Sequence, residues 1–222
     1  MSDSAGSSPK GNPRSAHFLA ALAVLAVVLS FLFAKSFKPE LVLFSNDAPL
    51  GLIQAEAGQQ ATKEFWTGFW NDLNWIGIEQ PAIAPGPSLW TYWLMSIFGE
   101  ERAPVLNAKF YGPISLLFLG LSAWLFFRQL GFRNAVCVLG GIAAALNMNT
   151  FSHVCWGLPT RAMSQAAIFL ALAALQSGSV RHFWVKAVLA GIAVGLAIIE
   201  GFDVGALYSL YVAGFAIFLV LP

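Results

Sequence analysis

Long apolar runs separated by short polar segments make up most of this chain. Residues 1–16 are rich in Ser, Gly and Pro and show no hydrophobic periodicity, so we predict a disordered tail. Residues 17–34 form the first apolar run, long enough as a helix to cross a hydrocarbon core of about 30 Å. After a polar interval, five further runs occupy residues 111–127, 134–149, 161–175, 185–200 and 204–221. The pattern predicts six transmembrane helices.

The interval 35–110 is too polar to be a span and too apolar to be a disordered linker. Within residues 64–77, Phe, Trp, Leu and Ile recur at helical spacing, which predicts an amphipathic helix in the headgroup plane. A further helix is expected over 49–62, and the apolar segment 88–98 is too short to cross and should lie in the interface. The alternative is a simple aromatic belt, since Trp and Tyr favour the lipid boundary.

Composition supports a membrane protein. Of the 222 residues, 58% are hydrophobic and 10% are charged, against roughly 25% charged in soluble domains. We therefore predict an all-α integral membrane protein, divided into a tail (1–16), a first span (17–34), an outer loop (35–110) and a five-helix bundle (111–222). With 12 basic and 11 acidic residues, the chain lacks the basic excess of a nucleic-acid partner. Cys137 and Cys155 lack metal or redox spacing and are interpreted as small apolar fillers.

The positions of Lys and Arg predict the orientation in the membrane. Short cytoplasmic segments hold an excess of these residues, and here the cations fall on one side of the six spans. They are Lys10, Arg14, Arg128, Arg133, Arg181 and Lys186. This places the N-terminus in the cytoplasm and the loop 35–110 outside, as in a bacterial inner-membrane protein. A cleaved signal peptide is the competing reading of residues 17–34, but the apolar run is long for one and ends in a poor cleavage site.

Small residues recur at four-residue spacing in two of the spans. They are Ala187, Gly191 and Gly195 in one span, and Gly140 with Ala144 in another. Such stripes let helix backbones approach closely in lipid. We therefore expect them to pack helices together.

With this orientation, ionisable residues from separate parts of the chain gather near the outer surface: Asp47, Lys109, His153, Arg161, Glu200 and Asp203. Charges near membrane depth are costly, so a polar pocket on the outer face would account for them. Each of these residues also has a purely structural interpretation.

Asp47 suits a helix N-cap before Ala48-Pro49 as well as a general base. Arg161 could bind a phosphate or extend into lipid headgroups. Glu200 and Asp203 could bind a cation or cap the last span, while His153 is interpreted as an interfacial polar residue. Walker, GxSxG and HExxH motifs are absent from the sequence.

Four stretches carry a resemblance to a known family: LFSNDAPLG, NAKFYGPISLLFLGLSAWLFFRQLGF, ALNMNTFSHVCWG and IIEGFDVGALYSLYVAG. They resemble the YfhO-like bacterial membrane proteins, within the GT-C-type glycosyltransferases, over residues 17–222. The resemblance implies an inverting transfer of a sugar from a polyprenyl-phosphate donor to an acceptor at the outer face of the inner membrane.

By this resemblance, Asp47 matches the acidic position of the first loop and would be the general base. No family motif fixes the other positions. We expect Lys109 and Arg161 to bind the donor phosphate, and Glu200 and Asp203 to line the pocket or bind a metal ion. The cofactor stays open, with a divalent cation as one option. Family members are generally longer, so we expect this chain to be either the N-terminal part of a longer protein or a truncated gene product. The alternatives are a transporter or lipid-handling protein, and a scaffold subunit of a membrane complex.

Overall fold

The protein is helical almost throughout the part that the computed structural model describes, residues 13–41, 69–71, 78–80, 85–99, 101–176 and 182–221. Its helices are α1 (Pro13–Leu32), α3 (Pro85–Phe98), α4 (Ala103–Gln129), α5 (Asn134–Ala145), α6 (Met148–Cys155), α7 (Pro159–Gln176) and α8 (Phe183–Val220). By length and composition, four helical segments can cross a membrane, or five if the bent pair α5–α6 is one span. The predicted all-α membrane protein is confirmed, with fewer clear spans than six.

The predicted span 134–149 is two helices rather than one. α5 and α6 meet at an angle of 48°, and the side chain of Asn147 accepts a hydrogen bond from the Asn149 backbone N–H at 3.1 Å. An Asn in this position begins a new helix, because its side chain satisfies a backbone donor that the helix cannot. The chain therefore bends at Asn147 and stays helical to Cys155.

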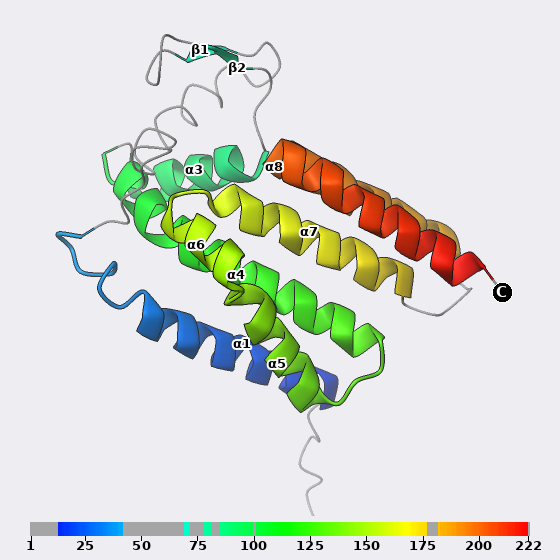
Figure 1. The fold of residues 1–222 in the computed structure, drawn as a ribbon. Helices are drawn as coiled ribbons and strands as arrows, with labels where there is room; N and C mark the ends of the chain where they lie inside the picture. Colours follow the sequence, from blue (N-terminus) through cyan, green and yellow to red (C-terminus); the bar gives the residue numbers. More distant parts are fainter. Residues whose placement is uncertain are drawn as a thin grey trace, which may run out of the picture.

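The last two predicted spans both lie in α8, whose axis reverses direction between them. Its two apolar segments are Phe183–Gly201 and Asp203–Val220. Gly205 lies directly against the backbone of Ala197, eight residues earlier, which a straight helix would hold about 12 Å away. α8 is therefore a tight helical hairpin, with both of its ends at the same end of the bundle (Figure 1).

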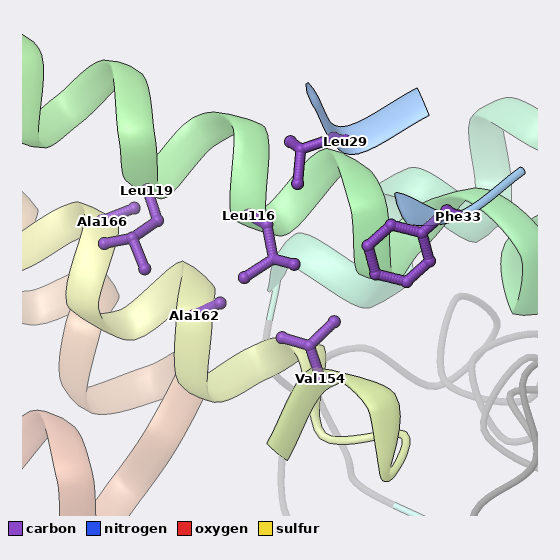
Figure 2. Packing of buried hydrophobic residues seen from close by; sticks show 7 residues of the cluster. All are labelled: Leu29, Phe33, Leu116, Leu119, Val154, Ala162 and Ala166. Atoms are coloured by element: carbon purple, nitrogen blue, oxygen red, sulfur yellow. The ribbon is translucent and has the colours of Figure 1, made fainter. Parts of the chain in front are cut away.

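The bundle is organised around α4 and α7 (Figure 1). α4 packs against α1, α5 and α7, and α7 packs in turn against α8. Figure 2 shows the core where four helices meet, built from α1 and the turn after it, α4, α6 and α7. Its residues are Leu29, Phe33, Leu116, Leu119, Val154, Ala162 and Ala166.

Small residues bring helices together beside one of the predicted stripes and not at the other. A Cβ on the predicted Gly140 would clash with the Phe127 ring of α4. The backbone contact is at its neighbour Gly141, which the stripe did not include: a Cβ there would lie 2.6 Å from the carbonyl oxygen of Gly120, so α4 and α5 touch through their backbones. The prediction for Gly191 and Gly195 is wrong, because a Cβ on either would meet nothing within 4 Å. The buried alanines of that segment lie on another face instead: Ala190, Ala193 and Ala197.

The amphipathic helix predicted over 64–77 is wrong where the structure describes it. β1 (Phe69–Asn71) pairs antiparallel with β2 (Ile78–Gln80). Aromatic and β-branched residues favour strands, and the intervening Asn and Asp residues compete with helix formation through their side chains. The helix predicted over 49–62 lies outside the described residues.

The short helix predicted over 88–98 is present as α3. Leu94 is buried, whereas Trp93, Ile97 and Phe98 are exposed. This two-faced character fits a helix that lies on the bundle and faces lipid on its other side. Contact with the membrane interface stays a prediction.

Both cysteines are free thiols. Cys137 is fully buried beside Ala21 and Trp124, where α1, α4 and α5 meet. Cys137 therefore acts as the small apolar filler that was predicted.

Candidate functional site

One end of the bundle, which we call the α3 end, carries α3, the residues after α1, the α6–α7 turn and the reversal of α8 (Figure 1). Four predicted site residues belong to segments at this end: Lys109, Arg161, Glu200 and Asp203. Asp47, the expected general base, lies outside the described residues. The opposite end holds the start of α1, the α4–α5 connection with Arg128 and Arg133, and the first turn of α8. The segments that the predicted topology puts on opposite sides therefore lie at opposite ends of the bundle. The orientation in the membrane stays a prediction.

Lys109 ties α4 to the chain that follows α1. Its side chain is 6% exposed, and its ammonium donates to the carbonyl oxygen of Lys38 and, at 3.1 Å, to that of Pro39. Next to it, the rings of Phe37 and Phe110 stack with their centroids 5.4 Å apart. Two of the three ammonium donors are therefore used by backbone carbonyls. This contact is structural, and it leaves Lys109 a weak candidate for a phosphate ligand.

The Arg161 guanidinium is hydrogen-bonded to a histidine across the α6–α7 turn. One of its terminal nitrogens, Nη1, lies 3.0 Å from Nε2 of His153. Because a guanidinium can only donate, Nε2 accepts, and the proton of a neutral imidazole then sits on Nδ1. The other four N–H groups of the guanidinium do not take part in this contact. Arg161 is therefore held in place and still able to bind an anion.

Beneath α3, an acid and a phenol meet in a buried position. Glu200 is 8% and Tyr111 5% exposed, and the two are close enough to interact electrostatically. Trp90 of α3 stacks on Tyr111 with centroids 6.5 Å apart. The Tyr111 hydroxyl is buried without a hydrogen-bond partner among the described residues. A buried polar group left in this way costs about 1–3 kcal/mol, so this hydroxyl is available to water or to a polar ligand.

Asp203 does not join this buried group, because its side chain is exposed. Glu200 and Asp203 therefore sit in different surroundings at the reversal of α8. Across the described part of the chain, no three His, Cys, Asp or Glu side chains come together in a way that could hold a metal ion.

A second polar cluster, which sequence reasoning missed, lies one helical turn further into the bundle. The Thr150 hydroxyl donates to Oε1 of Gln165 at 2.8 Å, and Nε2 of Gln165 donates to the Tyr208 hydroxyl at 3.4 Å. The signal was present in the sequence. Thr150 precedes His153 by three positions and Arg161 precedes Gln165 by four, which puts each pair on one helix face.

Comparison with protein-family models, with curated proteins and with solved structures gave no match.

Proposed function

We propose that this protein is a glycosyltransferase-like membrane module that transfers a sugar from a polyprenyl-phosphate donor to an acceptor at the outer face of the inner membrane. The observation that carries the proposal is the presence of Arg161, Glu200 and Tyr111 at one end of a largely apolar bundle. Ionisable groups at such depth are costly unless they are paired or functional. From the positions of Lys and Arg in the short connections, we propose that this end faces outward and that the N-terminus lies in the cytoplasm.

In the proposed inverting reaction, an acceptor hydroxyl attacks the anomeric carbon while the bond from that carbon to the phosphate oxygen breaks. The electron pair leaves with polyprenyl phosphate, and the hydroxyl proton goes to a general base. Asp47 is the proposed base, by the sequence resemblance. Arg161 is the better of the two proposed phosphate ligands, because its guanidinium keeps free donors whereas Lys109 is used by carbonyls.

Glu200 and Tyr111 are proposed to face the transferred sugar or the acceptor. A carboxylate accepts and a phenol both donates and accepts hydrogen bonds, as a sugar hydroxyl requires. Trp90 packs over this position from α3, so that α3 shields it from one side. Asp203, exposed at the turn, is proposed to contact the more water-accessible part of the substrate.

The test is sugar transfer in membranes that carry the protein, with radiolabelled polyprenyl-phosphate sugar and matched protein amounts. Asp47→Asn should remove most of the transfer, because the amide cannot accept the proton, while the protein remains inserted. Glu40→Gln is the matched control, since this carboxylate is exposed and should be dispensable. Equal transfer by wild type and Asp47→Asn would reduce Asp47 to a helix cap, worth about 1 kcal/mol.

A second candidate function is transport, and the broken helix pair α5–α6 favours it. Substrate sites in transporters are commonly formed where a helix is interrupted within the membrane, and here the 48° bend borders the polar cluster of Thr150 and Gln165. This candidate predicts substrate uptake into proteoliposomes with no new glycosidic bond. The sugar-transfer assay in membranes therefore separates the two functions, because only a transferase yields labelled acceptor.

A further inference from the structure

A cavity of about 380 Å³ lies between the α5–α6 break, α7 and the second half of α8. Its volume is within the range of small-molecule sites. Six of its lining residues are polar: Asn147, Asn149, Thr150, Gln165, Tyr208 and Tyr211. The remaining described lining residues are alanine, isoleucine, phenylalanine and leucine, so the cavity combines hydrogen-bonding groups with an apolar wall.

None of the described residues that line the cavity carries a charge. The nearest cation along α7 is Arg161, one turn from Gln165, and it contacts His153. Burying an ion without a partner costs several kcal/mol. The described lining therefore offers no charged partner to an ionic ligand, which favours an uncharged polar group.

The hydrogen bonds within the cavity determine what it offers to a ligand. Gln165 accepts from Thr150 and donates to the oxygen of Tyr208, so the Tyr208 O–H is left to donate. The Tyr211 hydroxyl and the Asn149 side chain have no hydrogen-bond partner within the described segments. Phenol and amide donors in this arrangement suit a ligand with hydroxyl, ester or other carbonyl oxygens.

The mouth of the cavity lies among side chains that face outward. Tyr211, which lines the cavity, is 70% exposed, in a helical segment apolar enough to cross a membrane. A second hollow of about 440 Å³ shares Tyr208 and Tyr211 with the cavity and is otherwise lined by Val204, Leu207 and Leu210. A polar cavity next to an apolar hollow matches the two parts of an amphiphile.

We propose that this cavity binds an uncharged glycerolipid, with its hydroxyl and ester oxygens on Tyr208, Tyr211 and Asn149 and a hydrocarbon chain along the neighbouring hollow. Diacylglycerol is the simplest lipid of this class. The ligand enters sideways from the bilayer, past the exposed Tyr211. This site is separate from the Arg161 and Glu200 positions and does not depend on sugar transfer.

The test compares two lipids with the same chains, dioctanoylglycerol and dioctanoylphosphatidylglycerol, by binding to the purified full chain in detergent. We expect the uncharged lipid to bind at least tenfold more tightly. The double variant Tyr208→Phe/Tyr211→Phe should weaken its binding by about tenfold, because it removes two hydrogen bonds and keeps both rings. Ser209→Ala is the control, since that hydroxyl donates to the Ala206 carbonyl of its own helix at 2.6 Å.

Equal or tighter binding of the phosphatidylglycerol would overturn the proposal, as would the absence of dioctanoylglycerol binding or unchanged binding by the double variant. Ala144→Leu gives an independent check from the opposite wall, because Ala144 lines the cavity from α5. This variant should reduce dioctanoylglycerol binding without lowering the thermal midpoint of unfolding. Undiminished binding by the folded Ala144→Leu protein would also contradict the site.

Discussion

α7 and the second segment of α8 reverse the relation between polarity and burial that is usual in soluble proteins. α7 contains Arg161, Ser164 and Gln165 and is not among the helices apolar enough to cross a membrane alone, yet eight of its 18 residues are buried. Asp203–Val220 does satisfy that condition, and only 11% of it is buried. The less apolar helix is inside and the more apolar one is outside.

The difference follows from the solvent that surrounds each helix. Lipid provides no hydrophobic drive for helices to associate, so the interior is held by close packing and hydrogen bonds. α7 accordingly has small residues against α4 and α8 and donates from Ser164 to the Ala197 carbonyl at 2.8 Å. The outer segment of α8 instead presents Leu207, Leu210 and Ile217 outward. Between these two helices, the more polar one is therefore the one inside.

The largest expected effect is on the turn that returns α8 to the outside of α7. Gly205→Ala would place a Cβ inside the backbone of Ala197, so the hairpin has to open. We expect a loss of about 3 kcal/mol in the free energy of unfolding, near the upper end for overpacking. Gly214→Ala, in the same helix with nothing within 4 Å of its Cβ, should be neutral or stabilising. Unfolding in mixed micelles by denaturing detergent measures both, and equal stability would contradict the tight reversal.

A second, smaller effect comes from the same substitution made inside and outside. Ala171→Leu enlarges a fully buried residue of α7 that packs against α8, and should cost about 2 kcal/mol. Ala206→Leu makes the same change at an exposed position of α8 and should change stability by less than about 0.5 kcal/mol. The detergent titration again provides the measurement. Similar losses of stability at the two positions would show that the second segment of α8 is packed against other residues rather than exposed.

Much of this architecture follows from hydrophobic pattern alone. The runs that predict spans coincide with α1, α4 and α8, because an uninterrupted apolar run has few other stable arrangements. The sequence did not predict the bend at Asn147, since a single cap residue within an apolar run decides it. It also failed at Gly191 and Gly195, because a four-residue stripe defines a face of a helix but does not name the neighbour that the face meets.

The sequence predicted at which end of the bundle the candidate site lies, but not which residues contact one another there. Lys109, Arg161 and Glu200 were expected at one end of the bundle, and the helix order brings them there. The carbonyls that Lys109 binds and the Arg161–His153 pair come from residues that are distant in the sequence or lie across a turn. Such partners depend on how helices pack, which composition and periodicity do not specify.

The smallest expected effect separates a hydrogen bond between helices from one within a helix. Ser164→Ala removes the bond from buried α7 to the Ala197 carbonyl, and we expect a loss of about 0.6 kcal/mol, the average for such bonds between membrane helices. Ser209→Ala removes a bond to Ala206 in the same outer helix and should change nothing measurable. Since Ser164 also touches Gly201, Ser164→Cys tests whether its volume matters more than its donor. If Ser164→Ala and Ser209→Ala are equally stable to detergent, packing alone holds α7 against α8.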